Sequence, residues 1–288
     1  MKTLILTLFL IFNGILNVYA NPWGFFAHKK INYLAVFMLP TPLNKLYKRE
    51  IHLLQEYAVL PDERRYVMDN EAQRHYIDLD HYELKTIEFK NFKQLSKTIP
   101  EDSLNSHGIV VWYIPIAFLK LKKAFQVKDW AMIIKYSAEL GHYVADAHVP
   151  LHTTSNYDGQ KTGQSGIHAF WESRIPELLN NELEEWLGPA EYIQNVELKA
   201  WEYVLSSNSL VQDLLTKEKE LALSYSNHHK YSFEQKGNSL VKNYAKDYAL
   251  AYHKLLRHTI EDRFSESVKQ VASLWYTAWL EAGQPDIP

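Results

Sequence analysis

Two pairs of residues that commonly bind metals, each pair spaced four positions apart, lie close together in the middle of this chain. The first pair is His142 and Asp146, and the second is His168 and Glu172. His152 lies between them. Residues four apart on an α-helix point the same way, so each pair can present an imidazole and a carboxylate to one cation. The chain has no cysteine, so a zinc site must use His, Asp, Glu and backbone ligands. The pattern therefore predicts a multinuclear zinc site carried by helices.

Helical periodicity covers most of the chain. Apolar residues recur at three- and four-residue spacing in six long segments and in a shorter one that follows His28. The long segments are 42–57, 104–125, 128–147, 167–180, 195–215 and 239–282. No alternation of apolar and polar residues persists long enough to predict a strand, and nothing marks a linker. With 288 residues, 47% of them hydrophobic, we predict an all-α, single-domain bundle of many helices.

Three stretches between these segments are predicted to be irregular. Residues 60–65 contain a proline that breaks the preceding helix, and Asp62 stands where an N-cap is expected. Residues 73–82 hold His75 among other histidines, acids and aromatics without a sustained period, which favours a turn that lines the site. Residues 157–166 are rich in glycine and polar side chains, which predicts a loop.

Residues 1–20 have the pattern of a secretory signal peptide. Lys2 provides the positive start, an apolar run follows it, and small residues stand three and one positions before a cut ahead of Asn21. The apolar run is shorter than the roughly 20 residues that span a membrane, and no other run approaches that length. We therefore predict a mature domain of residues 21–288 that is secreted or periplasmic, with no transmembrane segment after cleavage.

The charge balance argues against a duplex-DNA binder. Removal of Lys2 with the signal peptide lowers the 31 Lys and Arg to 30, against 34 Asp and Glu, a formal charge of −4. A mildly acidic protein lacks the basic surface on which duplex binding depends. Phosphate groups remain possible ligands, because metal ions bind them directly.

Several motifs together resemble one known superfamily. They are Trp23, His28, the sequence GHYVADAHVPLH at 141–152 and the sequence IHAFWE at 167–172. The chain resembles the zinc-dependent phospholipase C and single-strand-specific zinc nuclease superfamily over about residues 23–176. The resemblance implies an all-α fold whose cleft binds three zinc ions (Zn²⁺) and hydrolyses phosphate esters.

The resemblance also implies which residues bind each zinc ion. The first ion is assigned Asp62, His75, His142 and Asp146. The second is assigned His152, His168 and Glu172. The third is assigned His28, the backbone of Trp23, and Asp146 as a bridge to the first.

Two of these assignments leave alternatives open. Asp69 or Asp78 can take the place of Asp62 as the upstream carboxylate. In the superfamily the tryptophan is the free N-terminus and its amine is a ligand, whereas the predicted cut leaves Asn21 and Pro22 ahead of Trp23.

The remaining histidines are assigned structural positions. His148 is expected to pack or to support the site from behind. His107 is expected to be a capping or core residue. His228, His229, His253 and His258 are expected to lie on the surface or in ordinary polar contacts.

The predicted activity is hydrolysis of phosphodiester bonds by a metal-activated water, with Asp62 orienting or deprotonating that water. Glu172 as the terminal ligand favours a phospholipase C-like enzyme that cuts at phospholipid head groups. The short spacing from Trp23 to His28 favours the alternative, a single-strand nuclease or 3′-nucleotidase of the same fold. A non-catalytic secreted zinc-binding protein is a further alternative. A monomer is expected in each case.

Overall fold

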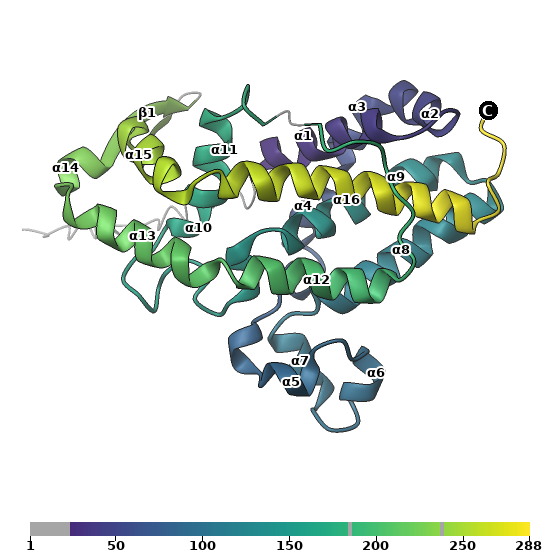
Figure 1. Ribbon diagram of the computed structural model, residues 1–288, viewed down its shortest axis with the longest axis horizontal. Coiled ribbons are helices and arrows are strands. Elements are labelled where there is room, and N and C mark those ends of the chain that lie inside the picture. The colour runs from purple at the N-terminus through teal and green to yellow at the C-terminus, as the bar shows by residue number, and fades with distance from the viewer. Residues whose placement is uncertain (1–23, 184–185, 237–238) are drawn as a thin grey trace, which may run out of the picture.

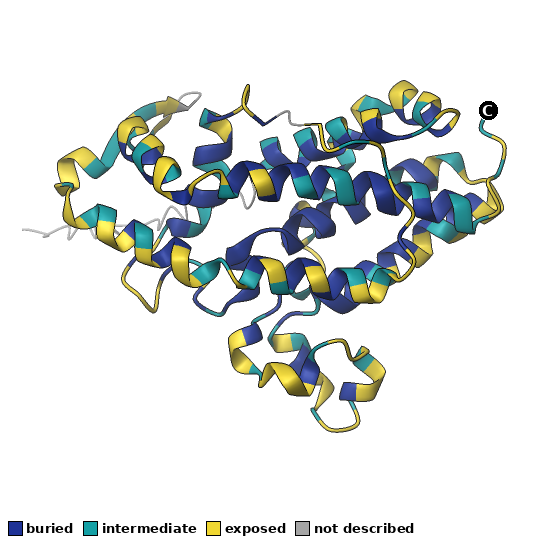
Figure 2. Cartoon of the chain, in the orientation of Figure 1, coloured by how far each residue is buried: buried dark blue, intermediate teal, exposed yellow. Residues whose placement is uncertain are grey.

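A long helix, α16 (Thr259–Glu281), runs along the middle of the molecule in Figure 1. It packs against α8 (Val110–Val127), α9 (Trp130–Ala147) and α1 (Phe25–Ala35). Buried residues lie on the facing sides of these helices (Figure 2), so the apolar stripes of the sequence meet in one core. This is a computed structural model, and it describes residues 24–183, 186–236 and 239–288.

The local sequence and the core together hold α9 in place. Asp129 caps its first turn by accepting the N–H of Met132 at 3.1 Å. On the opposite side, the indole of Trp275 in α16 donates to the Ser137 carbonyl at 2.8 Å. Most of the last three turns of α9 is buried. A helix enclosed in this way presents its polar residues to the interior, where they need partners.

Shorter elements complete the body. Before α8 they are η1 (Val36–Met38), α2 (Leu43–Arg49), α3 (Ile51–Tyr57), α4 (Leu60–Arg64), η2 (Ala72–Arg74) and η3 (Leu79–His81). A small lobe made of α5 (Leu84–Ile87), α6 (Phe92–Leu95) and α7 (Glu101–Ser106) projects below the body in Figure 1. After α9 come η4 (Pro150–Thr153), α10 (Ile167–Ala169), the π-helical turn η5 (Phe170–Arg174) and α11 (Ile175–Leu178).

The C-terminal third adds α12 (Val196–Asn208), α13 (Val211–Leu223), α14 (Asn227–Lys230) and α15 (Lys246–Leu256). It also contains a feature that the sequence pattern did not predict. The strands β1 (Tyr231–Lys236) and β2 (Ser239–Tyr244) pair antiparallel, from Tyr231 opposite Tyr244 to Lys236 opposite Ser239. The prediction of one helix over 239–282 was therefore wrong at its start, because pairing with β1 overrides the helical period of residues 239–244.

Predicted helices are interrupted at further points, including Ser209 and Leu210 between α12 and α13. The segment 42–57 breaks at Glu50 between α2 and α3. The segment 104–125 breaks at Gly108, whose φ of +83° and close approach to the Tyr76 carbonyl exclude a side chain. The segment 239–282 breaks again at Arg257 and His258, which are both left-handed. Asp62 lies inside α4 and is not its N-cap.

The predicted fold class is confirmed, since the described residues form a single bundle dominated by helices. No described helix is both long and apolar enough to cross a bilayer. The predicted signal peptide, residues 1–20, lies outside the described residues.

Candidate active site

A cavity of about 630 Å³ lies between residues 65–78, 151–158 and 168–172. His75, His152, His168 and Glu172 are among the side chains that line it. These residues come from separate elements that meet because His75 and the segment after it pair with η4. The N–H of Ile77 donates to the His152 carbonyl at 2.9 Å, and the imidazole Nδ1 of His152 donates to the His75 carbonyl at 2.6 Å.

The first predicted group, made of Asp62, His75, His142 and Asp146, is buried, with His75 at the cavity wall. His142 donates from Nδ1 to the Ala58 carbonyl at 2.8 Å, which turns its Nε2 toward the group. That Nε2 lies 3.0 Å from His75 Nδ1 and 3.2 Å from Asp146 Oδ2. Asp62 Oδ1 lies 3.7 Å and 3.8 Å from the same two histidine nitrogens. The structure therefore brings all four residues together.

The second predicted group, made of His152, His168 and Glu172, lies in the cavity wall. His168 and Glu172 lie four apart across α10 and η5, with His168 Nε2 3.0 Å from Glu172 Oε1. His152 Nε2 lies 3.3 Å from Glu172 Oε2 and 3.2 Å from His168 Nε2. The other ring nitrogen of His168 donates to the Tyr157 carbonyl at 3.2 Å. The loop predicted over 157–166 thus orients one of the three donors.

Asp146 lies between the two groups and next to His28. Its Oδ2 faces His75 and His142, while its Oδ1 lies 3.5 Å from His28 Nε2 and 3.7 Å from His152 Nδ1. The ring of His28 stacks on that of His142 with centroids 3.9 Å apart. Asp146 thus lies within 4 Å of donor nitrogens of both His28 and the His75–His142 pair. Trp23, the other predicted residue of the third set, lies outside the described residues.

The ring orientations test whether a metal ion fits. His152 and His168 both donate from Nδ1 to backbone carbonyls, so their Nε2 lone pairs face each other and the Glu172 carboxylate. Lone pairs and a carboxylate at this separation repel one another unless a proton or metal ion lies among them. Imidazole nitrogens fixed by a carbonyl on the far side, together with a carboxylate, form a typical zinc ligand set. The donor chemistry fits zinc.

Burial and charge move the pKa values of the groups in different directions. Burial lowers the pKa of His75 to about 4 and raises that of Asp62 to about 6. Burial also acts to lower the pKa of His152, but the carboxylates of Asp146 and Glu172 outweigh it and raise the pKa to about 9. Burial acts to raise the pKa of Glu172, whereas the neighbouring histidines lower it to about 2. The group in the cavity wall therefore attracts positive charge.

Gly141 allows α1 to approach α9 closely enough to deliver His28. A Cβ at position 141 would lie 2.0 Å from Asn32 Oδ1. Asn32 in turn donates from Nδ2 to the Ala138 carbonyl at 3.1 Å, so α1 is hydrogen-bonded to α9 at this point. His28 lies one turn before Asn32 and therefore reaches the ring of His142.

Glu71 is a buried carboxylate that was missed in the sequence. Its Oε1 accepts the hydroxyl of Tyr143 and lies 3.4 Å from Arg64 Nη2. Its Oε2 lies 2.5 Å from Arg74 Nη1, and its Oε1 is 3.8 Å from His75 Nε2. Glu71 and His75 are four apart, the same spacing as the two recognised pairs, so the signal was present. These contacts fix the side of His75 that faces away from the first group.

Asp69 and Asp78, the alternatives to Asp62, lie outside the first group. Asp69 is exposed. Asp78 lines the cavity but lies 3.6 Å from His107, whose ring stacks on that of His81 at 3.8 Å. His107 is the C-cap residue of α7, as expected, and it also joins a third donor group at the base of the lobe. Of the three aspartates, Asp62 is the one that contacts both His75 and His142.

His148 lies outside these groups. Its Nδ1 donates to the Val144 carbonyl at 2.7 Å, and its ring lies 4.6 Å from that of Tyr203. Burial, followed by the charge of Arg263, lowers the pKa of His148 well below its usual value. His148 is thus a neutral packing residue.

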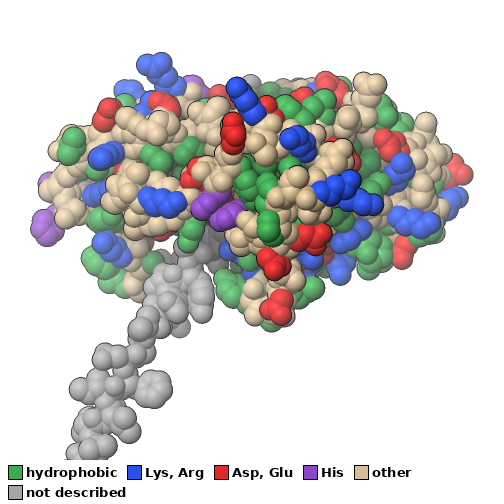
Figure 3. Space-filling view, turned by 90° about the horizontal axis from the view of Figure 1, so that it is seen from below, with side chains coloured by type: hydrophobic (Ala, Val, Ile, Leu, Met, Phe, Trp, Pro, Cys, Tyr) green, Lys and Arg blue, Asp and Glu red, His purple; other side chains and the backbone are tan. Residues whose placement is uncertain are grey.

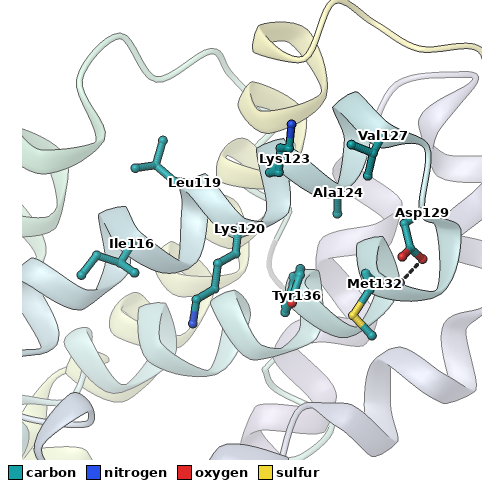
Figure 4. Close-up of a pocket in the computed structure, with 9 residues that line it drawn as sticks. All are labelled: Ile116, Leu119, Lys120, Lys123, Ala124, Val127, Asp129, Met132 and Tyr136. Carbon is teal, nitrogen blue, oxygen red and sulfur yellow. Dashed lines mark hydrogen bonds between the residues drawn. The ribbon is translucent and has the colours of Figure 1, made fainter.

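A second hollow, between α8 and α9, has a different chemistry (Figure 4). Aliphatic side chains such as Leu119 and Val127, both more than half exposed, occupy much of it. Lys120, Lys123 and Asp129 lie at its edges, and the one hydrogen bond drawn joins Asp129 to the backbone of Met132. None of the histidine and carboxylate groups lies there, so the first cavity is the candidate active site.

The protein is an all-α bundle, and its histidine–carboxylate groups lie next to one another at one cavity. Helical proteins of this class are suited to binding several metal ions. The chain belongs to the S1/P1 nuclease family, whose sequence model matches residues 23–274. The superfamily inferred from the motifs is thereby confirmed. Comparison with curated proteins gave no match.

Comparison with solved structures gave matches to two clostridial alpha-toxins, of which the first shows a similar fold. The alpha-toxin of Clostridium perfringens from an avian strain is 15% identical with a TM-score of 0.50, and the match covers 92% of this chain and 64% of that chain. The alpha toxin of Clostridium absonum is 14% identical with a TM-score of 0.48, covering 92% and 65%. The chain thus spans slightly less than two thirds of the length of these toxins, and the first likeness describes the fold alone.

Proposed function

We propose that the protein is a secreted zinc-dependent phosphodiesterase. The observation that carries this proposal is the orientation of His152 and His168, whose Nε2 atoms converge with Glu172 on one point of a solvent-accessible cavity. Membership of the S1/P1 nuclease family supports the reaction class. In this proposal the first zinc ion is bound by Asp62, His75, His142 and Asp146. The second is bound by His152, His168 and Glu172, and the third by His28, Asp146 and the backbone of Trp23.

The chain's own residues have distinct parts in this reaction. Bound zinc ions would supply positive charge for the phosphate group and lower the pKa of the attacking water. Asp62 Oδ2 is buried without a hydrogen-bond partner among the described residues, so it is available to accept a proton from that water. Arg65 lines the cavity with Nη1 3.4 Å from Asp62 Oδ1, where its guanidinium can bind a phosphate oxygen.

Of the two substrate classes, single-stranded nucleic acid is the better supported. The matched family is one of nucleases. Tyr66, Tyr76 and Tyr157 line the cavity, and Tyr66 and Tyr157 are more than half exposed, so their rings present surface on which bases can stack. The face seen in Figure 3 intersperses basic and acidic side chains, without a continuous basic track for a duplex. Phospholipid head groups remain the second candidate, on the strength of Glu172 as the terminal carboxylate.

A side-by-side assay tests the proposal. The mature protein is incubated with single-stranded DNA and with phosphatidylcholine vesicles, each before chelation, after chelation and after zinc is restored. We expect cleavage of the DNA that chelation abolishes and zinc restores. If only the vesicles are cleaved, the proposed activity is that of a phospholipase and not that of a nuclease. If fully zinc-loaded protein cleaves neither substrate, the catalytic proposal fails and the non-catalytic zinc-binding alternative replaces it.

Sequencing of the mature N-terminus tests the third zinc set separately. A chain that begins at Trp23 would have an α-amine available as a ligand, whereas a chain that begins at Asn21 would not.

A further inference from the structure

A second group of histidines and glutamates lies at the corner between α15 and α16. His253 is in α15, His258 precedes the first residue of α16, and Glu261 is in the first turn of α16. His253 Nε2 lies 3.1 Å from Glu261 Oε1, and His258 Nδ1 lies 3.3 Å from the same oxygen. Glu182, from the segment that follows α11, places a carboxylate oxygen within 4.8 Å of the donors of His253 and Glu261. Glu182, His253 and Glu261 thus converge from three parts of the chain, and His258 contacts Glu261 beside them.

The carboxylate of Glu261 is incompletely satisfied. Glu261 is 9% exposed, and its Oε2 is buried without a hydrogen-bond partner among the described residues. A buried carboxylate oxygen without a partner is unfavourable, and a cation is the partner that such an oxygen accepts best. His253 Nδ1 is likewise buried without a partner. An ion pair between Glu261 and the two histidines therefore leaves donors and acceptors of the group unused.

The nitrogen–oxygen distances are similar to those of the group in the cavity wall, although at the corner both imidazoles contact one oxygen and their ring centroids lie 6.4 Å apart. There, two imidazole nitrogens lie 3.0 Å and 3.3 Å from the Glu172 carboxylate. Here, two imidazole nitrogens lie 3.1 Å and 3.3 Å from the Glu261 carboxylate. Neither His253, His258, Glu261 nor Glu182 lines the candidate active-site cavity. The corner group is thus separate from the proposed reaction.

We propose that His253, His258, Glu261 and Glu182 form a structural zinc site that joins α15, α16 and the segment after α11. Two imidazoles and two carboxylates match the four-ligand preference of zinc. Calcium and magnesium prefer oxygen ligands alone, so they fit this group poorly. The left-handed backbone of Arg257 and His258 is costly for residues other than glycine, and a metal bond to His258 would help to hold it.

Zinc stoichiometry of the mature protein tests this site. The protein is equilibrated with zinc, dialysed, and analysed for metal per chain, in the wild type and in the His253→Gln and His258→Ala variants. We expect each variant to retain about one zinc ion fewer than the wild type, with phosphodiesterase activity unchanged within about twofold. The side chain of His258 is 79% exposed, so the His258→Ala variant should fold.

A matched control comes from the same end of the molecule. His229 in α14 is exposed, contacts Ser226 at 3.0 Å and belongs to neither donor group, so His229→Ala should retain the full zinc content. Equal zinc content in the wild type and in folded His258→Ala and Glu182→Gln variants would overturn the proposal and leave the group as an ion pair. Because the readout is metal content, this outcome is distinguishable from a failure of the proposed phosphodiesterase activity.

Discussion

The cavity wall and the α15–α16 corner contain the same donor arrangement, in which two imidazoles converge on one glutamate carboxylate. In the cavity wall, both histidines also donate from Nδ1 to backbone carbonyls, and the group faces a cavity of about 630 Å³. At the corner, His253 Nδ1 has no such partner among the described residues, and the group lies away from that cavity. We therefore expect the corner to bind a metal ion without catalysing a reaction, because it lacks the access from a cavity and the supporting hydrogen bonds of the cavity wall.

The largest effect is expected from a substitution in the cavity wall. His168→Ala removes one donor from the cavity wall and should lose about one zinc ion per chain. The kcat/KM on a generic phosphodiester should fall on the order of 10³-fold, because a lost metal ion withdraws several kcal/mol of charge stabilisation. Steady-state kinetics and metal analysis measure both quantities. Unchanged metal content would show that His168 is not a ligand.

A smaller effect is expected from the supporting contacts that distinguish the cavity side. Tyr143→Phe removes the hydroxyl that donates to Glu71, which lies next to His75. We expect zinc affinity or kcat/KM to fall by about 10- to 100-fold, as for other residues that orient metal ligands from behind. Tyr113→Phe is the matched control, since its ring packs on Tyr143 but its hydroxyl contacts Lys120. Equal losses in both variants would indicate a packing effect.

The smallest effect is expected from a substitution that tests whether Asp62 or Asp69 is the carboxylate of the first group. Asp69 is exposed, so Asp69→Asn should leave zinc content unchanged and change kcat/KM by less than about twofold. Asp62→Asn, measured alongside it, should reduce both. If the two variants gave the opposite result, the group around His75 would be assigned to the wrong aspartate.

The sequence was sufficient to predict contacts between residues that lie one helical turn apart. His142 and Asp146 lie four apart on one helix, as do His168 and Glu172 across two helical turns, and the structure places each pair side by side. The spacing could not show that Asp146 would also lie beside His28, because that contact depends on the close packing of α1 on α9 at Gly141.

Tertiary contacts account for what the sequence did not show. The β-hairpin depends on pairing between residues 231–236 and 239–244, which a helical period within 239–244 conceals. Glu71 lies in a polar stretch that predicts an exposed surface, and its contacts with Tyr143, Arg64 and Arg74 compensate for its burial. Similarly, Glu261 and His253 become one group because α15 turns sharply into α16 at two left-handed residues.

The lobe formed by α5, α6 and α7 begins and ends at almost the same point. The N–H of Asp78 donates to the His107 carbonyl at 2.7 Å, and the N–H of Val110 donates to the Tyr76 carbonyl at 3.1 Å. The free energy needed to close a loop rises only slowly with its length. A change in the length of the lobe would therefore cost little in loop closure, because the hydrogen bonds at its two ends hold the adjoining residues in place. Such a change would alter the surface next to the cavity and leave His75 in position.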